Sequence, residues 1–247
     1  MYSVRPNFFL RTLYPSSIWR IGARPGFSPL GGDKRGGAIF LSFDDGPIPE
    51  VTPWVLSQLK KHNALATFFC IGANIEKHPD IFRQIISEGH AVGNHTYDHV
   101  NGWKTKTERY LENVEKSAAL MANEKWLMAN VHQPSTINHQ PLFRPPYGRM
   151  KRSQYSLLKS QYSVVMWDVL SGDFDQSISE EKCLKNVLTK TREGSIVVFH
   201  DSIKAKKNLY HALPKFLEYF SEKGFVFEGL DTAVGCLSPA GGGRGRK

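Results

Sequence analysis

The sequence predicts an α/β domain in which parallel strands and helices alternate to form a barrel, either complete or incomplete. From residue 38 onward, short runs of β-branched and aromatic residues alternate with segments of helical periodicity. Strands that alternate with helices are joined by crossover connections and therefore run parallel. Six or seven strand–helix units in about 200 residues favour a barrel over an open sheet.

Each predicted strand is a short apolar run rich in β-branched or aromatic residues. The strands are expected at residues 38–43, 65–71, 91–92, 142–144, 163–167, 195–200 and 225–227. The first helix is expected to begin near Pro53, with Thr52 as its N-cap. A second helix, over residues 75–87, has apolar residues at i,i+4 spacing and ends at Gly89. Further helices are expected over residues 107–121, 179–192 and 208–222, the last kinked or split by Pro214.

Three segments lack this periodicity. Residues 1–37 are expected to form a basic arm, and residues 239–247 a flexible basic tail rich in glycine. The folded domain is expected to span residues 38–238. Residues 123–141 are rich in Asn, His, Gln and Pro and are expected to be irregular. Their larger side chains either edge a binding groove or have no role: Trp126, His132 and His139.

The charge distribution decides between classes of binding partner. A formal net charge of +9 and a pI near 9.4 suggest binding to nucleic acid or to a membrane surface. However, residues 1–37 carry +5 and the last four residues carry +3, which leaves +1 for the rest. Because the body is nearly neutral, nucleic acid is not the expected partner. The basic ends remain able to hold the protein near an anionic wall polymer or membrane face.

The sequence lacks the patterns that are typical of membrane-spanning, exported and disulfide-rich proteins. No apolar run approaches the roughly 18–20 residues of a transmembrane helix, so no transmembrane segment is expected. Arg11 interrupts the short apolar stretch at residues 8–10, so no signal peptide is expected. The three cysteines are odd in number and form no C-x-x-C pair, which fits a reducing compartment. The default expectation is a cytoplasmic monomer, with association with the cell envelope left open.

Polar side chains follow the predicted strands, at the point where each strand ends. In a barrel of parallel strands, all of these points lie on one rim, where active sites are built. The clusters contain Asp44 and Asp45, then His95 and His99, then Arg144, Pro146 and Tyr147, then Trp167 with Asp173, and finally His200.

Two of these clusters together predict a metal site. His95 and His99, four residues apart, are expected on one side of a helical turn, where both imidazoles can face one ion. Alone, the His pair could be accidental, and Asp-Asp-Gly-Pro could be an ordinary turn. Together they indicate a His–His–Asp site. Because successive side chains at a strand end point in different directions, one aspartate would bind the metal and the other would act as a base.

The sequence resembles the NodB-type polysaccharide deacetylases, carbohydrate esterase family four. The resemblance rests on Ser-Phe-Asp-Asp-Gly-Pro at residues 42–47, His-Thr-Tyr-Asp-His at 95–99 and Arg-Pro-Pro-Tyr-Gly at 144–148, in this order. It covers about residues 38–228. It implies a distorted, incomplete (β/α) barrel. It also implies removal of N-acetyl groups from chitin-like or peptidoglycan GlcNAc units, or, for some members, of O-acetyl groups from xylan.

The resemblance also implies a role for individual residues. Asp44 would be the catalytic base, paired with Arg144. A divalent metal would be zinc, with cobalt or nickel as alternatives, and its ligands would be Asp45, His95 and His99. The Tyr147 backbone N–H would face the oxyanion. His200 would be the general acid, with Asp173 bound to its other ring nitrogen.

The chain departs from the family pattern in its apolar pocket. Phe174 stands where the family often has Trp, and Val198 stands where it often has Leu, while Ser42 replaces the common Thr. The residues expected to bind substrate are Tyr147, Pro146, Trp167, Phe174 and Val198. Trp103 is a further candidate for a subsite wall.

Four functions remain to be compared. The first is a metal-dependent N-deacetylase acting on an acetylated glycan, and the second is an O-acetyl esterase with the same machinery. The third, an inactive carbohydrate-binding domain, should have lost Asp44, a metal ligand or His200, yet all are present. The fourth, a non-haem iron oxygenase, also uses two His and one carboxylate but leaves Asp44 and His200 without a task.

Overall fold

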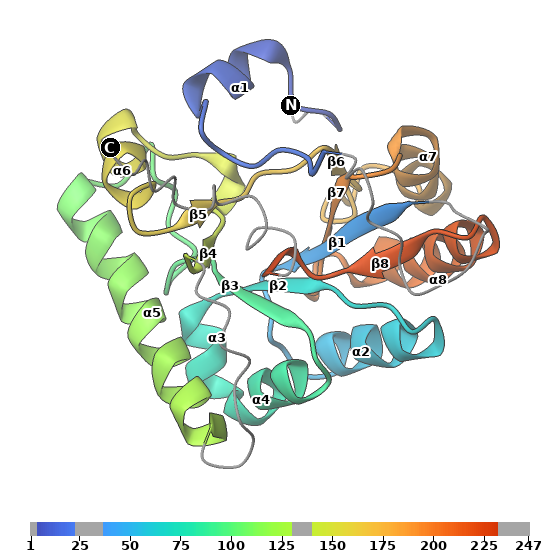
Figure 1. Ribbon diagram of the computed structural model, residues 1–247, viewed down its shortest axis with the longest axis horizontal. Helices are drawn as coiled ribbons and strands as arrows, with labels where there is room; N and C mark the ends of the chain where they lie inside the picture. The colour runs from blue at the N-terminus through green and yellow to red at the C-terminus, as the bar shows by residue number, and fades with distance from the viewer. Residues whose placement is uncertain (1–3, 23–36, 130–139, 232–247) are drawn as a thin grey trace, which may run out of the picture.

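The computed structural model describes residues 4–22, 37–129 and 140–231. In this part of the chain, the strands form one parallel sheet in the order β5-β4-β3-β2-β1-β7-β6, with β8 also paired to β1 (Figure 1). The strands are β1 (Ala38–Asp44), β2 (Thr67–Cys70), β3 (Ala91–Asn94), β4 (Leu142–Phe143), β5 (Ser163–Val164), β6 (Val169–Leu170), β7 (Ile196–His200) and β8 (Val226–Glu228). The expected incomplete barrel of parallel strands is confirmed.

Strand β1 lies at the centre of the sheet. Every residue of β1 is buried, as expected for a parallel strand covered on both faces. Along one edge, β1 pairs with β7. Along the other edge, the first half of β1 pairs with β8 and the second half with β2. The last residue of β1, Asp44, is therefore held by neighbouring strands on both sides.

Helices cover the outside of the curved sheet (Figure 1). They bury apolar side chains against it, including Leu213 and Phe216, which are fully buried. None of the described helices is both long and apolar enough to cross a membrane. The helices are α1 (Phe8–Leu13), α2 (Val51–Lys61), α3 (Gly72–Lys77), α4 (Pro79–Ser87), α5 (Thr107–Ala129), α6 (Arg152–Leu158), α7 (Glu180–Lys190) and α8 (Lys206–Glu222), with a short 3-10 helix at Pro146–Gly148.

Three helix predictions are wrong in detail. The helix expected over residues 75–87 is two helices, because Pro79 begins α4 and cannot continue α3. Thr52 is not an N-cap but lies inside α2, after Glu50, and its hydroxyl bonds elsewhere. Pro214 lies inside α8 without splitting it, so of the two expected effects the split is wrong and the kink stays a prediction.

The segments between α5 and β6 also differ from expectation. Helix α5 continues to Ala129, so the irregular segment expected over residues 123–141 is helical as far as residue 129, and Trp126 falls on the helix. His132 and His139 lie outside the described residues. Helix α6 and strand β6 are absent from the sequence prediction. The strand expected at residues 163–167 ends at Val164.

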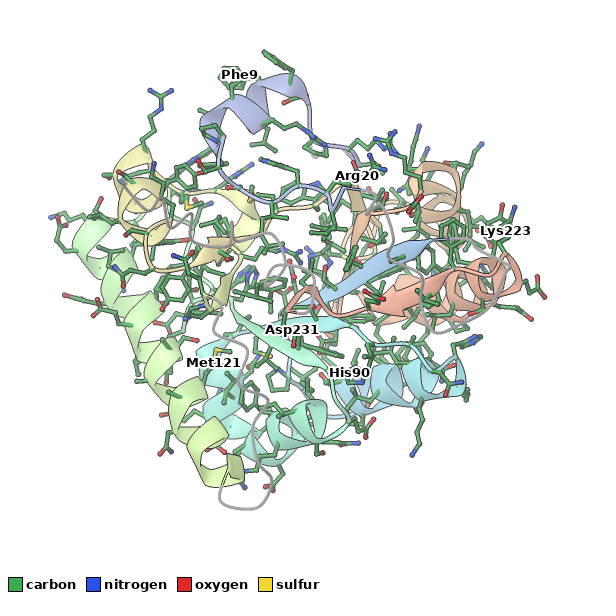
Figure 2. All side chains as sticks on the ribbon, viewed as in Figure 1. Phe9, Arg20, His90, Met121, Lys223 and Asp231 are labelled. Carbon is green, nitrogen blue, oxygen red and sulfur yellow. The ribbon has the colours of Figure 1, made fainter. Side chains whose placement is uncertain are left out.

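The N-terminal segment is not a separate arm, because part of it joins the edges of the sheet. Ile18 pairs with Val165, just beyond β5, and Arg20 pairs with Ser195, just before β7. The amide of Ile18 donates to the carbonyl of Val164 at 2.8 Å. Residues 18–20 thus connect the chain just beyond β5 with the chain just before β7. The domain boundary expected at residue 37 stays a prediction. Helix α1 lies outside this contact, and Phe9 projects from it away from the body (Figure 2).

Two side chains hold this segment in place. Asp168, which is 1% exposed, lies 3.9 Å from Arg5 and 3.5 Å from Arg11. The hydroxyl of Tyr14, also 1% exposed, donates to the carbonyl of Met150 at 2.8 Å and accepts from its amide at 3.0 Å. Met150 follows the Arg-Pro-Pro-Tyr-Gly segment, so the N-terminal residues support a loop of the candidate site.

We expect Tyr14→Phe to lower the free energy of unfolding by about 1–3 kcal/mol. The substitution keeps the ring but leaves the buried Met150 amide without its acceptor. Urea unfolding measures the change. The matched control is Tyr219→Phe on α8, whose side chain is 38% exposed. Equal stability of the two variants would show that the Tyr14 hydroxyl does not hold the loop.

Candidate active site

The predicted polar clusters meet at the carboxyl edge of the sheet. Asp44 is the last residue of β1 and His200 the last residue of β7, and the two are register partners on neighbouring strands. His95 directly follows β3, Arg144 directly follows β4, and Asp173 lies in the loop after β6. The shared edge predicted from the sequence is therefore present.

Arg144 and Asp44 form a buried ion pair beneath this edge. Arg144 is 1% exposed, and its Nη1 lies 2.6 Å from Asp44 Oδ1. Nη1 also donates to the Ser42 hydroxyl at 2.9 Å, and Nη2 donates to the carbonyl of Met166 at 2.9 Å. The guanidinium stacks over the Phe69 ring at 4.0 Å from its centroid. The donors of a fully buried cation are thus directed at carboxylate, hydroxyl and carbonyl oxygens, as burial requires.

The ion pair keeps Asp44 ionised. Burial alone would raise the pKa of Asp44, but the Arg144 guanidinium, helped by His95 and His200, holds this pKa below its ordinary value. Asp44 is therefore a carboxylate at neutral pH and able to accept a proton.

Asp45, His95 and His99 bring their ligand atoms within 4.8 Å of one another. Asp45 Oδ1 lies 3.2 Å from His99 Nε2 and 3.7 Å from His95 Nε2. The helical turn expected at His95 and His99 is wrong. The segment is a loop in which Thr96 and His99 have positive φ values of 63° and 54°, and this backbone brings the two rings to 5.1 Å.

The chemistry of these three side chains fits a divalent metal such as zinc. Burial, followed by the neighbouring His95, lowers the pKa of His99 to about 4, and burial also lowers the pKa of His95. Both imidazoles are therefore neutral at pH 7, as metal binding requires. His95 Nδ1 bonds to the Arg144 carbonyl at 2.7 Å, which leaves Nε2 facing Asp45. In the described part of the chain, the buried Asp45 Oδ1 has no hydrogen-bond partner, which suits a metal ligand.

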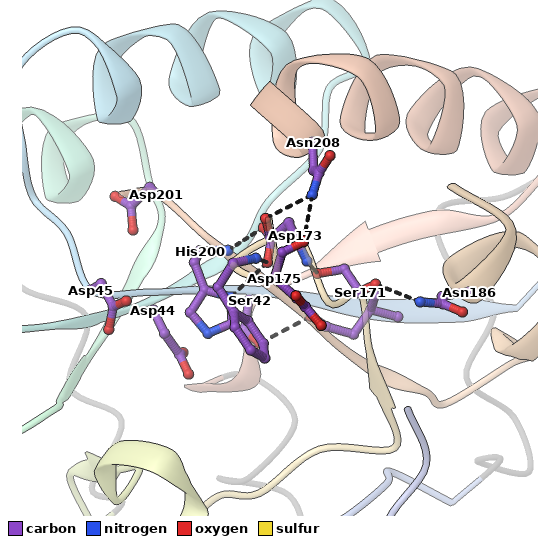
Figure 3. A network of polar contacts seen from close by, with 12 residues as sticks. Ser42, Asp44, Asp45, Ser171, Asp173, Asp175, Asn186, His200, Asp201 and Asn208 are labelled. Carbon is purple, nitrogen blue, oxygen red and sulfur yellow. Dashed lines mark hydrogen bonds and ion pairs between the residues drawn. The ribbon is translucent and has the colours of Figure 1, made fainter. Parts of the chain in front are cut away.

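Asp173 contacts both the backbone amide and the imidazole ring of His200 (Figure 3). Asp173 is fully buried, and its Oδ2 accepts from the His200 amide at 2.7 Å. Its Oδ1 lies 2.8 Å from His200 Nδ1. This arrangement matches the pairing that the family resemblance implies and fixes which ring nitrogen is free.

The same contact changes the acidity of His200. Burial alone would lower its pKa, but the charge and hydrogen bond of Asp173, helped by Asp45 and Asp44, outweigh burial and raise the pKa to about 9. His200 is therefore protonated at neutral pH and able to donate a proton.

Two asparagines that the sequence analysis does not select support the Asp173 loop. Asn208 of α8 donates to the carbonyl of Asp173 at 3.1 Å, and Asn186 of α7 donates to the carbonyl of Ser171 at 2.9 Å (Figure 3). Both are buried on helices. Asn208 lies near the start of α8, whose other buried residues are apolar. A single polar residue at the start of an apolar helix face is the signal that could have identified it.

Two of the residues expected to bind substrate contact this centre. The Tyr147 ring lies 4.6 Å from that of His99 and is 57% exposed, and the Phe174 ring lies 4.9 Å from that of His200. Trp167 packs against Gly148, where an added Cβ would lie 2.5 Å from the indole. Pro146 and Val198 are buried, with Val198 1% exposed. Their roles in binding stay predictions.

Trp103 remains a candidate for a subsite wall. Its side chain is 48% exposed, and its Nε1 donates to the Met150 carbonyl at 3.1 Å. The Arg149 guanidinium lies 5.0 Å from the centroid of its ring. An exposed, fixed aromatic face of this kind is suited to stacking on a sugar.

Known proteins share this sequence pattern and fold. The family described as Polysaccharide deacetylase matches residues 31–163. A peptidoglycan-N-acetylglucosamine deacetylase of Bacillus cereus is 33% identical over 78% of this chain and 67% of its own length. A chitooligosaccharide deacetylase of Azorhizobium caulinodans is 35% identical over 66% of this chain and 73% of its own length. The crystal structure of the Bc1960 peptidoglycan N-acetylglucosamine deacetylase has a TM-score of 0.74 at 27% identity, covering 93% of this chain and 97% of that one.

We expect NMR titration of the metal-free protein to give His200 a pKa of about 9. Asp173→Asn should lower this pKa clearly, since burial is then opposed only by the more weakly acting Asp45 and Asp44. Because the folded-state pKa is raised, the pair stabilises the fold fully below pH 6.5 and loses this contribution as pH rises through about 9. Asp80→Asn, on an exposed side chain of α4, is the control. An unchanged His200 pKa in Asp173→Asn would contradict the assignment.

Proposed function

The chain belongs to the polysaccharide deacetylase family, and on this basis we propose that it is a metal-dependent hydrolase that removes N-acetyl groups from glycans containing N-acetylglucosamine. One observation carries the proposal. An ionised carboxylate, Asp44, and a protonated imidazole, His200, end neighbouring strands in register, beside a His–His–Asp cluster. The site thus holds a proton acceptor, a proton donor and metal-ligating groups within one edge of the sheet.

The proposed substrate is a peptidoglycan-like or chitin-like chain. The relatives are named for deacetylation of peptidoglycan N-acetylglucosamine and of chito-oligosaccharides. Exposed aromatic rings at Tyr147 and Trp103 are suited to stack on sugar rings. The proposed active form is the monomer.

Asp45, His95 and His99 are proposed to hold the metal, with zinc as the first choice and cobalt or nickel as alternatives. A bound divalent ion of this kind polarises the acetyl carbonyl and increases the acidity of water. The chain itself orients the ligands, since the Arg144 carbonyl fixes the His95 ring and the strained turn at Asp45 directs its carboxylate at both imidazoles.

Proton transfer is assigned to Asp44 and His200. Asp44, held ionised by Arg144, accepts a proton from the water that attacks the acetyl carbon. The Tyr147 backbone N–H is proposed to donate to the oxyanion that then develops. His200, held by Asp173 at Nδ1, donates a proton from Nε2 to the departing amine. The C–N bond breaks, and the products are acetate and a free amino sugar.

An O-acetyl esterase is the second candidate. An alcohol leaves more easily than an amine and depends less on a proton donor. The raised pKa of His200 keeps that donor protonated at neutral pH, which favours the amide substrate.

An inactive domain is the third candidate, because the fold alone does not guarantee catalysis. A pseudoenzyme from Bacillus anthracis has a TM-score of 0.69 at 21% identity, which is a likeness of fold only. This chain keeps a carboxylate at Asp44, the cluster of Asp45, His95 and His99, and an imidazole at His200. Their presence supports an active enzyme.

We expect the protein to release acetate from N-acetylated chito-oligosaccharides or peptidoglycan fragments faster than from O-acetylated xylan. A chelator should abolish release, and Zn²⁺ or Co²⁺ should restore it. Asp44→Asn should lower kcat by about 10²–10⁴-fold, the usual contribution of a positioned acid or base. His99→Ala should remove the metal dependence together with the activity.

The control for this experiment is Asp80→Asn, which removes an exposed carboxylate from α4. It should behave like the unmodified protein. Full activity of Asp44→Asn, or hydrolysis that is indifferent to chelator and metal, would refute the proposed mechanism. Preference for xylan esters would favour the esterase.

A further inference from the structure

Asp201 is a buried acidic side chain that the proposed mechanism does not use. It directly follows His200 at the end of β7 and is fully buried. Its side chain points away from the His200–Asp173 pair and toward Asp45 (Figure 3). A buried carboxylate is costly unless its oxygens accept hydrogen bonds, so its partners indicate its task.

The partners of Asp201 all belong to the turn that carries Asp44 and Asp45 or to the helix that follows. The Gly46 amide donates to Asp201 Oδ1 at 3.0 Å, and the Thr52 hydroxyl donates to Oδ2 at 2.6 Å. The Asp201 amide donates to the Asp44 carbonyl at 3.0 Å. Asp201 therefore binds the turn through both its backbone and its side chain.

The contact at Gly46 is also tightly packed. A Cβ added to Gly46 would lie 2.0 Å from Asp201 Oδ2, so the carboxylate occupies the space that any other side chain would need. Thr52 is fixed in turn, because its hydroxyl accepts from the Ile48 amide at 2.9 Å. The carboxylate is thus enclosed by the turn from Gly46 to Thr52.

The opposite side of the turn is held by α3 and the residue before it. Asn74 donates to the Asp45 carbonyl at 2.8 Å, and the Ile71 amide donates to the Gly46 carbonyl at 2.9 Å. Between these contacts, Asp45 has a φ of 82°, a left-handed conformation unfavourable for a residue with a side chain. Such a conformation persists only where the surroundings fix it.

We propose that Asp201 is a positioning residue for the metal ligand Asp45. By holding Gly46 and Thr52, it keeps Asp45 in the left-handed conformation that directs its carboxylate at His95 and His99. This inference rests on the proposed function, because it assumes that Asp45 binds a metal. It gives the two adjacent carboxylates separate supports: Arg144 contacts Asp44, and Asp201 holds the turn beyond Asp45.

The test measures metal affinity rather than activity alone. We expect Asp201→Asn to weaken Zn²⁺ binding about 10–100-fold, the usual effect of removing a residue that orients a metal ligand. Binding is measured by competition with a chromophoric chelator. The visible absorption spectrum of the Co²⁺-loaded protein, which reports ligand geometry, should change as well.

A pair of Thr52 variants gives an independent readout. Thr52→Val removes the hydroxyl that donates to Asp201 and should also weaken Zn²⁺ binding. Thr52→Ser keeps the hydroxyl and should bind Zn²⁺ like the unmodified protein. This pair decides the question even if Asp201→Asn does not fold. The matched control is Asp168→Asn, another buried carboxylate, which accepts from the Ser195 hydroxyl at 2.8 Å and lies away from the turn.

The outcomes separate this proposal from the function on which it rests. If the unmodified protein binds neither Zn²⁺ nor Co²⁺, the proposed metal site fails together with this inference. If the unmodified protein binds metal and the folded Asp201→Asn and Thr52→Val variants match it in affinity and Co²⁺ spectrum, the positioning role alone is overturned. If Asp168→Asn weakened Zn²⁺ binding equally, the effect would come from general destabilisation, and the positioning role of Asp201 would also be overturned.

Discussion

The ion pair between Arg144 and Asp44 is the interaction on which the rest of this structure depends. The guanidinium follows β4, yet it contacts Asp44 on β1 and the carbonyl of Met166 beyond β5. It therefore joins three parts of the sheet beneath the candidate site. Loss of one partner would leave an uncompensated charge in the protein interior, which costs several kcal/mol. Arg144, which is proposed to tune the base, is thus also a structural element of the barrel.

The sequence was sufficient to locate most of the candidate site because of a topological rule. Parallel strands connected by crossovers end on one edge, so Asp44, Arg144 and His200 could be placed together although they lie far apart in the chain. The rule gives position along a strand but not backbone conformation. For this reason, the loop at His95 and His99 was expected as a helical turn, whereas it contains residues with positive φ.

Residues held only by long-range contacts could not be identified in this way. Tyr14 bonds to Met150, 136 residues away, and Thr52 bonds to Asp201, 149 residues away. Neither contact leaves a periodic pattern, since each depends on how loops meet after the sheet has formed. The sequence predicts an arm at the N-terminus because residues such as Tyr14 and Trp19 follow no helical or strand period, although both are buried. Local sequence patterns predict helices and strands, but they do not predict contacts between loops that are far apart in the chain.

The pairing of β1 with β7 has a consequence for how this site can change over evolution. Asp44 and His200 are opposite one another in a parallel ladder, so the separation of their Cα atoms follows the spacing of neighbouring strands, about 4.8 Å. That spacing is determined by main-chain hydrogen bonds and is indifferent to the identity of nearby side chains. Mutations in surrounding helices and loops can therefore change the surroundings of the candidate site while the backbone positions of the proposed proton acceptor and proton donor are inherited unchanged. The scaffold permits substrate range to diverge among descendants without rebuilding the hydrolytic step.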